Sequence, residues 1–106
     1  MANFAIVGAT GLVGTKMIER LGESKLKVDN IYLMASSRSA GRVLEFRGQD
    51  VVVEELNEHS FDKDIDYVIF SAGGATSLKF APIAEEHGAI VIDNSSAWRM
   101  EEDIDL

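Results

Sequence analysis

The sequence lacks cysteine altogether, so its 106 residues offer no disulfide, no thiolate metal ligand and no cysteine nucleophile. It also lacks a long apolar run: the longest, such as residues 67–70, are the length of a strand, whereas a membrane helix needs roughly 20 apolar residues. The first residues lead directly into an apolar strand, with no basic region and no cleavage site. We therefore expect no secretory signal and a cytoplasmic location.

Basic residues are scarce, since 10 Lys and Arg stand against 18 Asp and Glu and give a formal net charge of −8. Nucleic acids and anionic membranes bind basic patches, so we expect neither as a partner. An anionic cofactor is compatible with this charge if backbone N–H groups and one or two placed arginines bind it. His59 and His87 are far apart in sequence and lack partners at metal-ligand spacing, so we expect no metal site and no catalytic histidine.

Strand-like and helix-like segments alternate along the chain, which is typical of an α/β domain with a largely parallel sheet. Apolar runs predict strands at residues 4–7, 31–35, 67–71 and 89–92. Residues 42–56 predict a hairpin or two short strands, with a tight turn at 47–50, and residues 57–63 predict a loop or a single helical turn. We therefore predict one domain over residues 1–106, with a Rossmann-like, doubly wound, mostly parallel sheet and helices on both faces.

Two helices are expected between these strands. Apolar residues at four-residue spacing predict the first over residues 12–21, with Gly22 ending it. The second ends at Gly88 and begins either at Thr76, with an irregular first turn, or near Phe80, because an interior Pro82 disrupts a regular helix.

Residues 8–14 form a G-x-x-G-x-x-G element between the first strand and the first helix. Gly8 allows a sharp turn, Gly11 allows a pyrophosphate to approach the backbone, and Gly14 allows the helix to pack closely on the strand. The free N–H groups of the helix amino terminus suit phosphate oxygens. Because the element lies between a strand and a helix, we interpret it as a dinucleotide-binding turn rather than an ordinary connection.

The end of the second strand indicates which cofactor is bound. NAD-selective domains place an Asp or Glu there to bind the ribose 2′-OH, but no carboxylate occurs between Asp29 and Glu45. We predict NADP, with Arg38 as the main contact of the 2′-phosphate and Ser36 and Ser39 assisting. The alternative is that Arg38 is a solvated loop residue.

Two further segments follow strand ends. Residues 71–74 lie after a strand expected beside the first one, where doubly wound sheets bind ligands, although a flexible turn is equally compatible with their glycines. Residues 94–99 are polar, and Arg99 has the geometry to bind a phosphate or carboxylate. Without further information, a polar loop is the simpler interpretation of this second segment.

Taken together, these segments resemble aspartate-semialdehyde dehydrogenases, NADP-dependent enzymes of lysine, threonine and methionine synthesis. The matching segments follow the family's order and spacing from end to end of the chain: residues 8–14, 37–41, 71–74 and 93–100. The first is shared with many reductases, whereas the last, joined to residues 37–41, is specific. Acetylglutamyl-phosphate reductases share the glycine turn, but a different sequence around residues 93–99 is expected in them.

The resemblance implies an enzyme that reductively dephosphorylates β-aspartyl phosphate to aspartate semialdehyde and phosphate, using NADPH, a cysteine nucleophile and a histidine acid/base. It implies a substrate-phosphate contact from Arg99. The expected NADP contacts are Gly8, Thr10, Gly11, Leu12, Val13, Ser36, Arg38, Ser39, Ser71, Ala72 and Gly73.

The family's cysteine and histidine lie, in sequence, beyond the last residue of this chain, in or beside a second domain that also supplies the dimer interface. We therefore expect a homodimeric or homotetrameric full-length enzyme, and no turnover from this chain alone. The alternatives are a self-contained NADP-sensing module and another acyl-phosphate reductase, such as acetylglutamyl-phosphate reductase.

Overall fold

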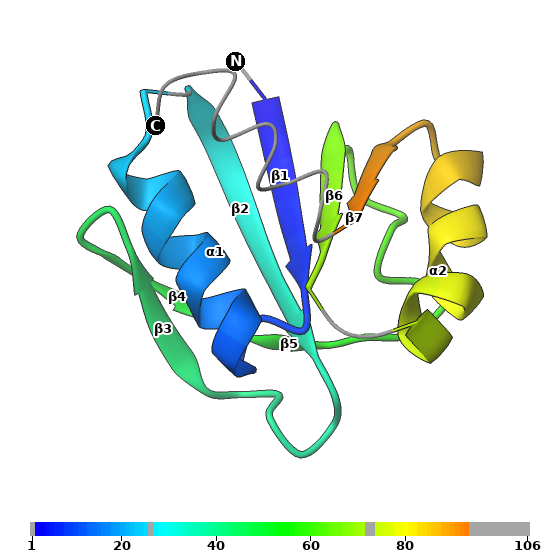
Figure 1. Ribbon diagram of the computed structural model, residues 1–106, viewed down its shortest axis with the longest axis horizontal. Helices are drawn as coiled ribbons and strands as arrows, with labels where there is room; N and C mark the ends of the chain where they lie inside the picture. The colour runs from blue at the N-terminus through cyan, green and yellow to red at the C-terminus, as the bar shows by residue number, and fades with distance from the viewer. Residues whose placement is uncertain (1, 26, 72–73, 94–106) are drawn as a thin grey trace.

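The computed structural model describes residues 2–25, 27–71 and 74–93 (Figure 1). Within them the chain forms seven strands and two helices. Their order is β1 (Ala2–Val7), α1 (Leu12–Glu23), β2 (Val28–Ala35), β3 (Val43–Phe46), β4 (Gln49–Val52), β5 (Glu54–Glu55), β6 (Tyr67–Phe70), α2 (Gly74–Glu86) and β7 (Ile90–Asp93).

Five strands form one sheet in the order β5-β2-β1-β6-β7, and every pairing in it is parallel. The chain runs from β1 to β2 on one side of β1, and later places β6 on its other side. The order of strands therefore reverses between β1 and β6, which is the topological switch point of a doubly wound sheet. The predicted Rossmann-like fold with a mostly parallel sheet is confirmed.

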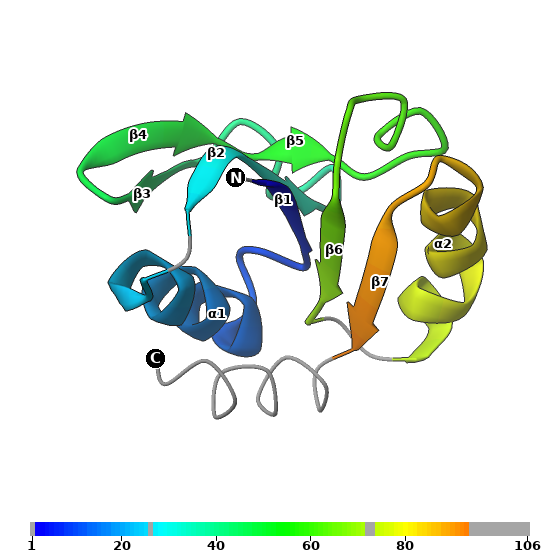
Figure 2. The ribbon, with the colours of Figure 1, turned by 90° about the horizontal axis from the view of Figure 1, so that it is seen from above.

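The two helices cover opposite faces of the sheet (Figure 2). Successive side chains of a strand point to opposite faces, and β1 follows this rule: Phe4 and Ile6 belong to the apolar cluster with α1, whereas Ala5 and Val7 belong to the cluster with α2. All four are at most 2% exposed. Because both faces of β1 are buried over residues 4–7, this part of the strand is apolar throughout, as is typical of a central parallel strand.

β3 and β4 form the predicted hairpin, which packs beside α1 (Figure 1). The turn is shorter than expected, because Gln49 and Asp50 already belong to β4. Arg47 and Gly48 both have positive φ, 51° and 81°, as a two-residue turn of type I′ requires. The Arg47 guanidinium donates hydrogen bonds to the carbonyls of Leu21, Gly22 and Ser24, and so fixes the hairpin to the carboxyl end of α1.

The prediction that Gly22 ends the first helix is wrong. α1 continues to Glu23, and Ser24 caps it with its backbone N–H and its hydroxyl, which both donate to the carbonyl of Leu21. Gly22 instead faces the hairpin, where a Cβ would lie 3.8 Å from the Phe46 ring. Ser24, rather than Gly22, therefore caps the helix.

The expected start of the second helix is also wrong, because α2 begins at Gly74, before both Thr76 and Phe80. Pro82 lies inside this helix and has no N–H to donate to the carbonyl of Leu78, four residues earlier. Gly88, with a φ of 86°, follows the helix end as predicted. In the parts of the chain that the structure describes, no helix is both long and apolar enough to cross a membrane.

Candidate functional site

A cleft of about 670 Å³ lies at the carboxyl ends of the central strands, at the switch point of the sheet. One wall comes from the turn after β1 and the start of α1, and the other from α2 and the segment after β5. The lining residues are Val7, Gly8, Thr10, Gly11, Leu12, Val13, Gly14, Ala35, Ser36, Ser37, Leu56, Ser71, Lys79 and Phe80. This is where doubly wound sheets bind their ligands.

The glycine turn shapes the first wall. Gly8 has a φ of 82°, which a residue with a Cβ rarely adopts, and its N–H donates to the carbonyl of Met34 at the end of β2. A Cβ on Gly14 would lie 2.0 Å from the Gly8 carbonyl oxygen, so α1 sits directly against the turn. The sharp turn and the close packing predicted for these two glycines are both confirmed.

Gly11 differs from Gly14 because a Cβ placed on it would meet nothing closer than the Gly8 oxygen at 3.5 Å, an ordinary contact. Its φ of −75° suits any residue. Neither packing nor backbone strain within the described residues therefore requires glycine here. Gly11 is the N-cap of α1 and makes no side-chain cap, so the free N–H groups of the first helical turn adjoin the cleft.

The end of β2 forms the floor of the cleft beside this turn. Residues 36–41 turn tightly, with the N–H groups of Ser39 and Ala40 both bonded to the Ser36 carbonyl. Ser36 and Ser37 line the cleft, but Arg38 and Ser39 are not among its lining residues.

Ser39 instead reaches the glycine turn, since its hydroxyl accepts a hydrogen bond of 3.0 Å from that of Thr10. Arg38 is exposed in the same turn. Thr10 itself lines the cleft, so Ser39 supports the site through a residue that is part of it.

Ser71 follows β6 and joins the strand ends across the switch point. Its Oγ lies 2.6 Å from the Val7 carbonyl oxygen and 3.1 Å from that of Gly8, and it also lines the cleft. The hydroxyl is therefore engaged with the backbone of the glycine turn. The predicted contacts Ala72, Gly73 and Arg99 lie outside the described residues.

Sequence reasoning missed the second wall, to which α2 contributes Lys79 and Phe80 and to which the segment after β5 contributes Leu56. Leu56 is held beside the end of β2 by a hydrogen bond of 2.7 Å from its N–H to the Ala35 carbonyl. The Lys79 ammonium lies 5.2 Å from the centroid of the Phe80 ring. The available signal was a single lysine soon after the glycine pair, on a helix whose start was placed too late.

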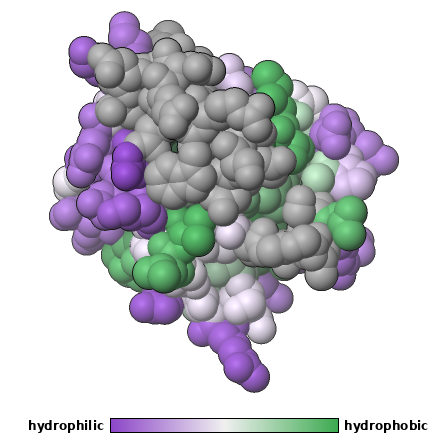
Figure 3. Space-filling view, in the orientation of Figure 1, coloured by the Kyte–Doolittle hydropathy of each residue, from purple (hydrophilic) through white to green (hydrophobic). Residues whose placement is uncertain are grey.

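Large apolar side chains are also exposed, one of them at the cleft and another on α2. Leu12, at the first position of α1, is 89% exposed, and Leu78 on α2 is 81% exposed. On the face seen in Figure 3, hydrophobic surface appears near the amino-terminal end of α1. The cleft therefore joins apolar walls to a polar floor of serine hydroxyls and backbone groups, a combination typical of cofactor sites.

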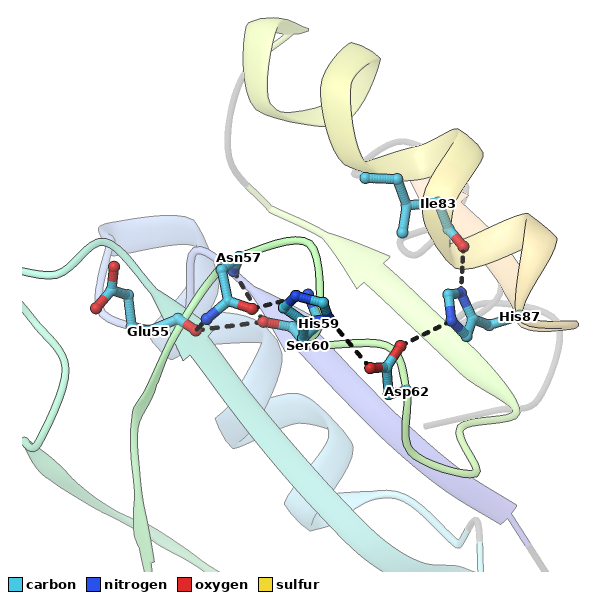
Figure 4. A network of polar contacts seen from close by, with 7 residues as sticks. All are labelled: Glu55, Asn57, His59, Ser60, Asp62, Ile83 and His87. Carbon is cyan, nitrogen blue, oxygen red and sulfur yellow. Dashed lines mark hydrogen bonds and ion pairs between the residues drawn. The ribbon is translucent and has the colours of Figure 1, made fainter.

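Neither histidine is among the lining residues of the cleft, and the fold brings the two close to one carboxylate although they are far apart in sequence. Asp62 contacts the two of them, His59 Nδ1 at 3.3 Å and His87 Nε2 at 2.9 Å (Figure 4). No cluster able to hold a metal ion is found among the described residues. The network instead ties the loop at residues 57–63 to the end of α2.

The pKa of His87 is raised above its ordinary value of 6.5, because the Ile83 carbonyl accepts a hydrogen bond from Nδ1 at 2.8 Å and Asp62 accepts one from Nε2. Glu86 adds a smaller attraction, and partial desolvation opposes the rise. Since both ring nitrogens face acceptors, the geometry favours the imidazolium.

Comparison with known proteins gives consistent matches. Residues 3–106 match the family described as "Semialdehyde dehydrogenase, NAD binding domain". Aspartate-semialdehyde dehydrogenase from Aquifex aeolicus (strain VF5) is 50% identical over 102 residues, which are 96% of this chain and 30% of that protein. The enzyme of the same name from Corynebacterium glutamicum is 45% identical over 108 residues, 100% of this chain and 31% of that protein.

Solved structures agree with these matches. Aspartate semialdehyde dehydrogenase II from Vibrio cholerae, complexed with ASA, superposes with a TM-score of 0.83 at 45% identity, covering 88% of this chain and 30% of that one. Aspartate semialdehyde dehydrogenase with NADP from Candida albicans gives 0.72 at 26% identity, covering 88% and 29%. This chain thus spans about 30% of the length of its relatives, and it belongs to the semialdehyde dehydrogenase NAD-binding domain family.

Proposed function

We propose that the cleft binds NADP, and that this chain is the nucleotide-binding part of an aspartate-semialdehyde dehydrogenase. The observation that supports this most directly is the contrast between Gly11 and Gly14. Gly14 is required by packing within the protein, whereas a Cβ on Gly11 would make only an ordinary contact, 3.5 Å from the Gly8 oxygen. A glycine that the fold does not need, at the mouth of a cleft and at a helix amino terminus, suits the close approach of a pyrophosphate.

The donor set fits a dinucleotide. The free N–H groups at the start of α1 suit the pyrophosphate, and the serine hydroxyls after β2 suit the ribose and its 2′-phosphate. No Asp or Glu lies among the described residues that line the cleft. This favours NADP, since a carboxylate after β2 would repel the 2′-phosphate, and the Candida albicans relative is a structure with NADP.

Within the proposed enzyme, bound NADPH supplies hydride for the reductive dephosphorylation of β-aspartyl phosphate to aspartate semialdehyde. The residues of this chain bind and orient the cofactor at the strand ends. They include no cysteine, so the proposed thiolate nucleophile and its histidine partner belong to other residues of the enzyme. On this proposal the chain alone shows no turnover, Arg99 is a contact of the substrate phosphate, and the full-length enzyme is a homodimer or homotetramer.

Calorimetric titration of this chain with NADP⁺ and with NAD⁺ tests the proposal, alongside an Arg38→Ala variant. We expect NADP⁺ to bind at least about tenfold more tightly than NAD⁺, roughly 1.4 kcal/mol. Arg38 is exposed and its long side chain can reach a bound 2′-phosphate from the turn, so the variant should lose part of this preference. Equal binding of the two nucleotides would contradict the choice of NADP, and an unchanged preference in the variant would remove Arg38 from the site.

A self-contained NADP-sensing module is the second candidate, and it predicts the same titration. The two differ in the gene. An open reading frame that continues into a cysteine-containing segment supports the enzyme, whereas a frame that stops at residue 106 supports the module.

A further inference from the structure

We propose that Lys79 is a specificity-determining residue that binds the 2′-phosphate of NADP from the α2 side of the cleft. The inference rests on the proposed function, because it assigns a contact within that cofactor site. The charge of the cleft differs from that of the whole chain. The chain carries a formal net charge of −8, yet Lys79 is the one charged side chain among the described lining residues. Its described lining thus holds a lysine and no carboxylate, which favours an anion.

Lys79 is available for a ligand. Its side chain is exposed, and no ion pair or hydrogen bond joins it to another residue in the described parts of the chain. Its ammonium lies over the Phe80 ring, 5.2 Å from the ring centroid. Phe80 is 8% exposed and anchored in the apolar cluster between α2 and the sheet. The base of the lysine is thus held on a rigid helix while its ammonium is not neutralised by a carboxylate.

The position of Lys79 favours the 2′-phosphate over the pyrophosphate. The pyrophosphate is proposed to lie against Gly11 and the start of α1, which covers the other face of the sheet (Figure 2). Lys79 belongs to the wall that contains Leu56, and the N–H of Leu56 is bonded to the last residue of β2. In doubly wound domains, residues at the end of this strand contact the ribose 2′ position of the dinucleotide.

The 2′-phosphate would therefore lie between hydroxyls on one side and an ammonium on the other. Ser36 and Ser37 line the cleft from the end of β2, and Lys79 lines the same cleft from α2. A lysine binds phosphate as a point charge, so it tolerates small shifts of the ligand. Arg38 is not a lining residue, so it would add charge from the rim while Lys79 supplies it from inside the cleft.

The test compares Lys79→Met, which keeps the length and apolar character of the stem, with Lys79→Arg, which keeps the charge. Lys25→Met is the matched control, because it removes the same charge from an exposed residue beyond the carboxyl end of α1, outside the cleft. Each protein is titrated with NADP⁺ and with NAD⁺ by calorimetry, and its thermal unfolding is recorded.

We expect Lys79→Met to weaken NADP⁺ binding by about tenfold or more and to leave NAD⁺ binding unchanged, since a charge-assisted hydrogen bond to one phosphate is lost. Lys79→Arg should retain most of the preference, and Lys25→Met all of it. If Lys79→Met weakens both nucleotides by the same factor, or weakens neither, the inference is wrong. A wild-type chain that binds neither nucleotide would instead refute the proposed function itself. The wild-type titration is therefore carried out before those of the variants.

Discussion

Two glycines of one turn should respond in opposite ways to the same substitution. Gly11 and Gly14 are three residues apart, and each can be replaced by alanine. On Gly14 the added Cβ would lie 2.0 Å from the Gly8 carbonyl oxygen, where an ordinary contact begins at 3.4 Å, so the helix must move away from the turn by about 1.4 Å. The obstacle is backbone, which cannot rotate aside as a side chain can.

The magnitude for Gly14→Ala follows from two opposing effects. Alanine is favoured over glycine inside a helix by about 1 kcal/mol, but overpacking a close contact costs up to about 3 kcal/mol and occasionally more. We expect a net loss of about 2 kcal/mol in the free energy of unfolding. For a chain of this size, this lowers Tm by roughly 10 °C.

Gly11→Ala should behave differently, because its Cβ would meet only the Gly8 oxygen at 3.5 Å. Alanine is a poorer N-cap than glycine, so the loss of stability is about 1 kcal/mol or less. The new methyl group would instead stand where the pyrophosphate approaches α1, and NADP⁺ affinity should fall at least about tenfold.

Thermal unfolding followed by circular dichroism measures the first effect, and calorimetric titration with NADP⁺ measures the second. We expect Gly14→Ala to be the less stable variant, and Gly11→Ala to be folded but deficient in NADP⁺ binding. A Gly11→Ala variant that binds NADP⁺ like the wild type would refute the assignment of Gly11 to the cofactor site. A Gly14→Ala variant with unchanged Tm would refute the packing argument.

The other predictions concern a pH dependence and a hydroxyl. The pKa of His87 is raised by the Ile83 carbonyl and by Asp62. The contribution of the charged His87 to stability is therefore fully present below about pH 6.5, and it is lost as the pH rises through the higher pKa of the folded state. The Tm difference between wild type and His87→Gln should shrink over that rise, and a difference independent of pH would contradict this. Ser71→Ala removes the hydroxyl that holds two carbonyls at the end of β1 and its turn, so we expect a loss of about 1–2 kcal/mol by urea unfolding. Ser37→Ala, at an exposed serine in the same cleft, serves as its control, and equal effects of the two would sink the explanation.

Much of the fold could be predicted from the sequence, because its strongest patterns are those of burial. β1 and β6 are apolar on both faces, and glycines follow β1 at the spacing of a strand–turn–helix connection. The element ends were harder, since local hydrogen bonds decide them. Ser24 ends α1 with its own hydroxyl, whereas Gly22 lies inside the helix and faces the hairpin, where a Cβ would make only an ordinary contact with Phe46.

The candidate site was predicted in part, for a similar reason. Residues of the glycine turn and Ser36 carry local signals and do line the cleft. Lys79 has no local signal, because its place in the same cleft as Ser36 depends on how α2 packs against the sheet. The link between His59 and His87 through Asp62 was invisible for the same reason, since 28 positions separate the histidines in sequence while the fold brings both to one carboxylate.

The central claim is that the cleft at the switch point binds NADP, and amide chemical-shift mapping of this chain tests it most directly. Spectra of the ¹⁵N-labelled protein are recorded during titration with NADP⁺. The account predicts that the largest shifts fall on the amides of the glycine turn, on Ser36 and Ser37, and on Lys79, whereas the hairpin of β3 and β4 is unaffected. Shifts that centre on the hairpin or on the His59–Asp62–His87 network, or no shifts at saturating NADP⁺, would contradict it.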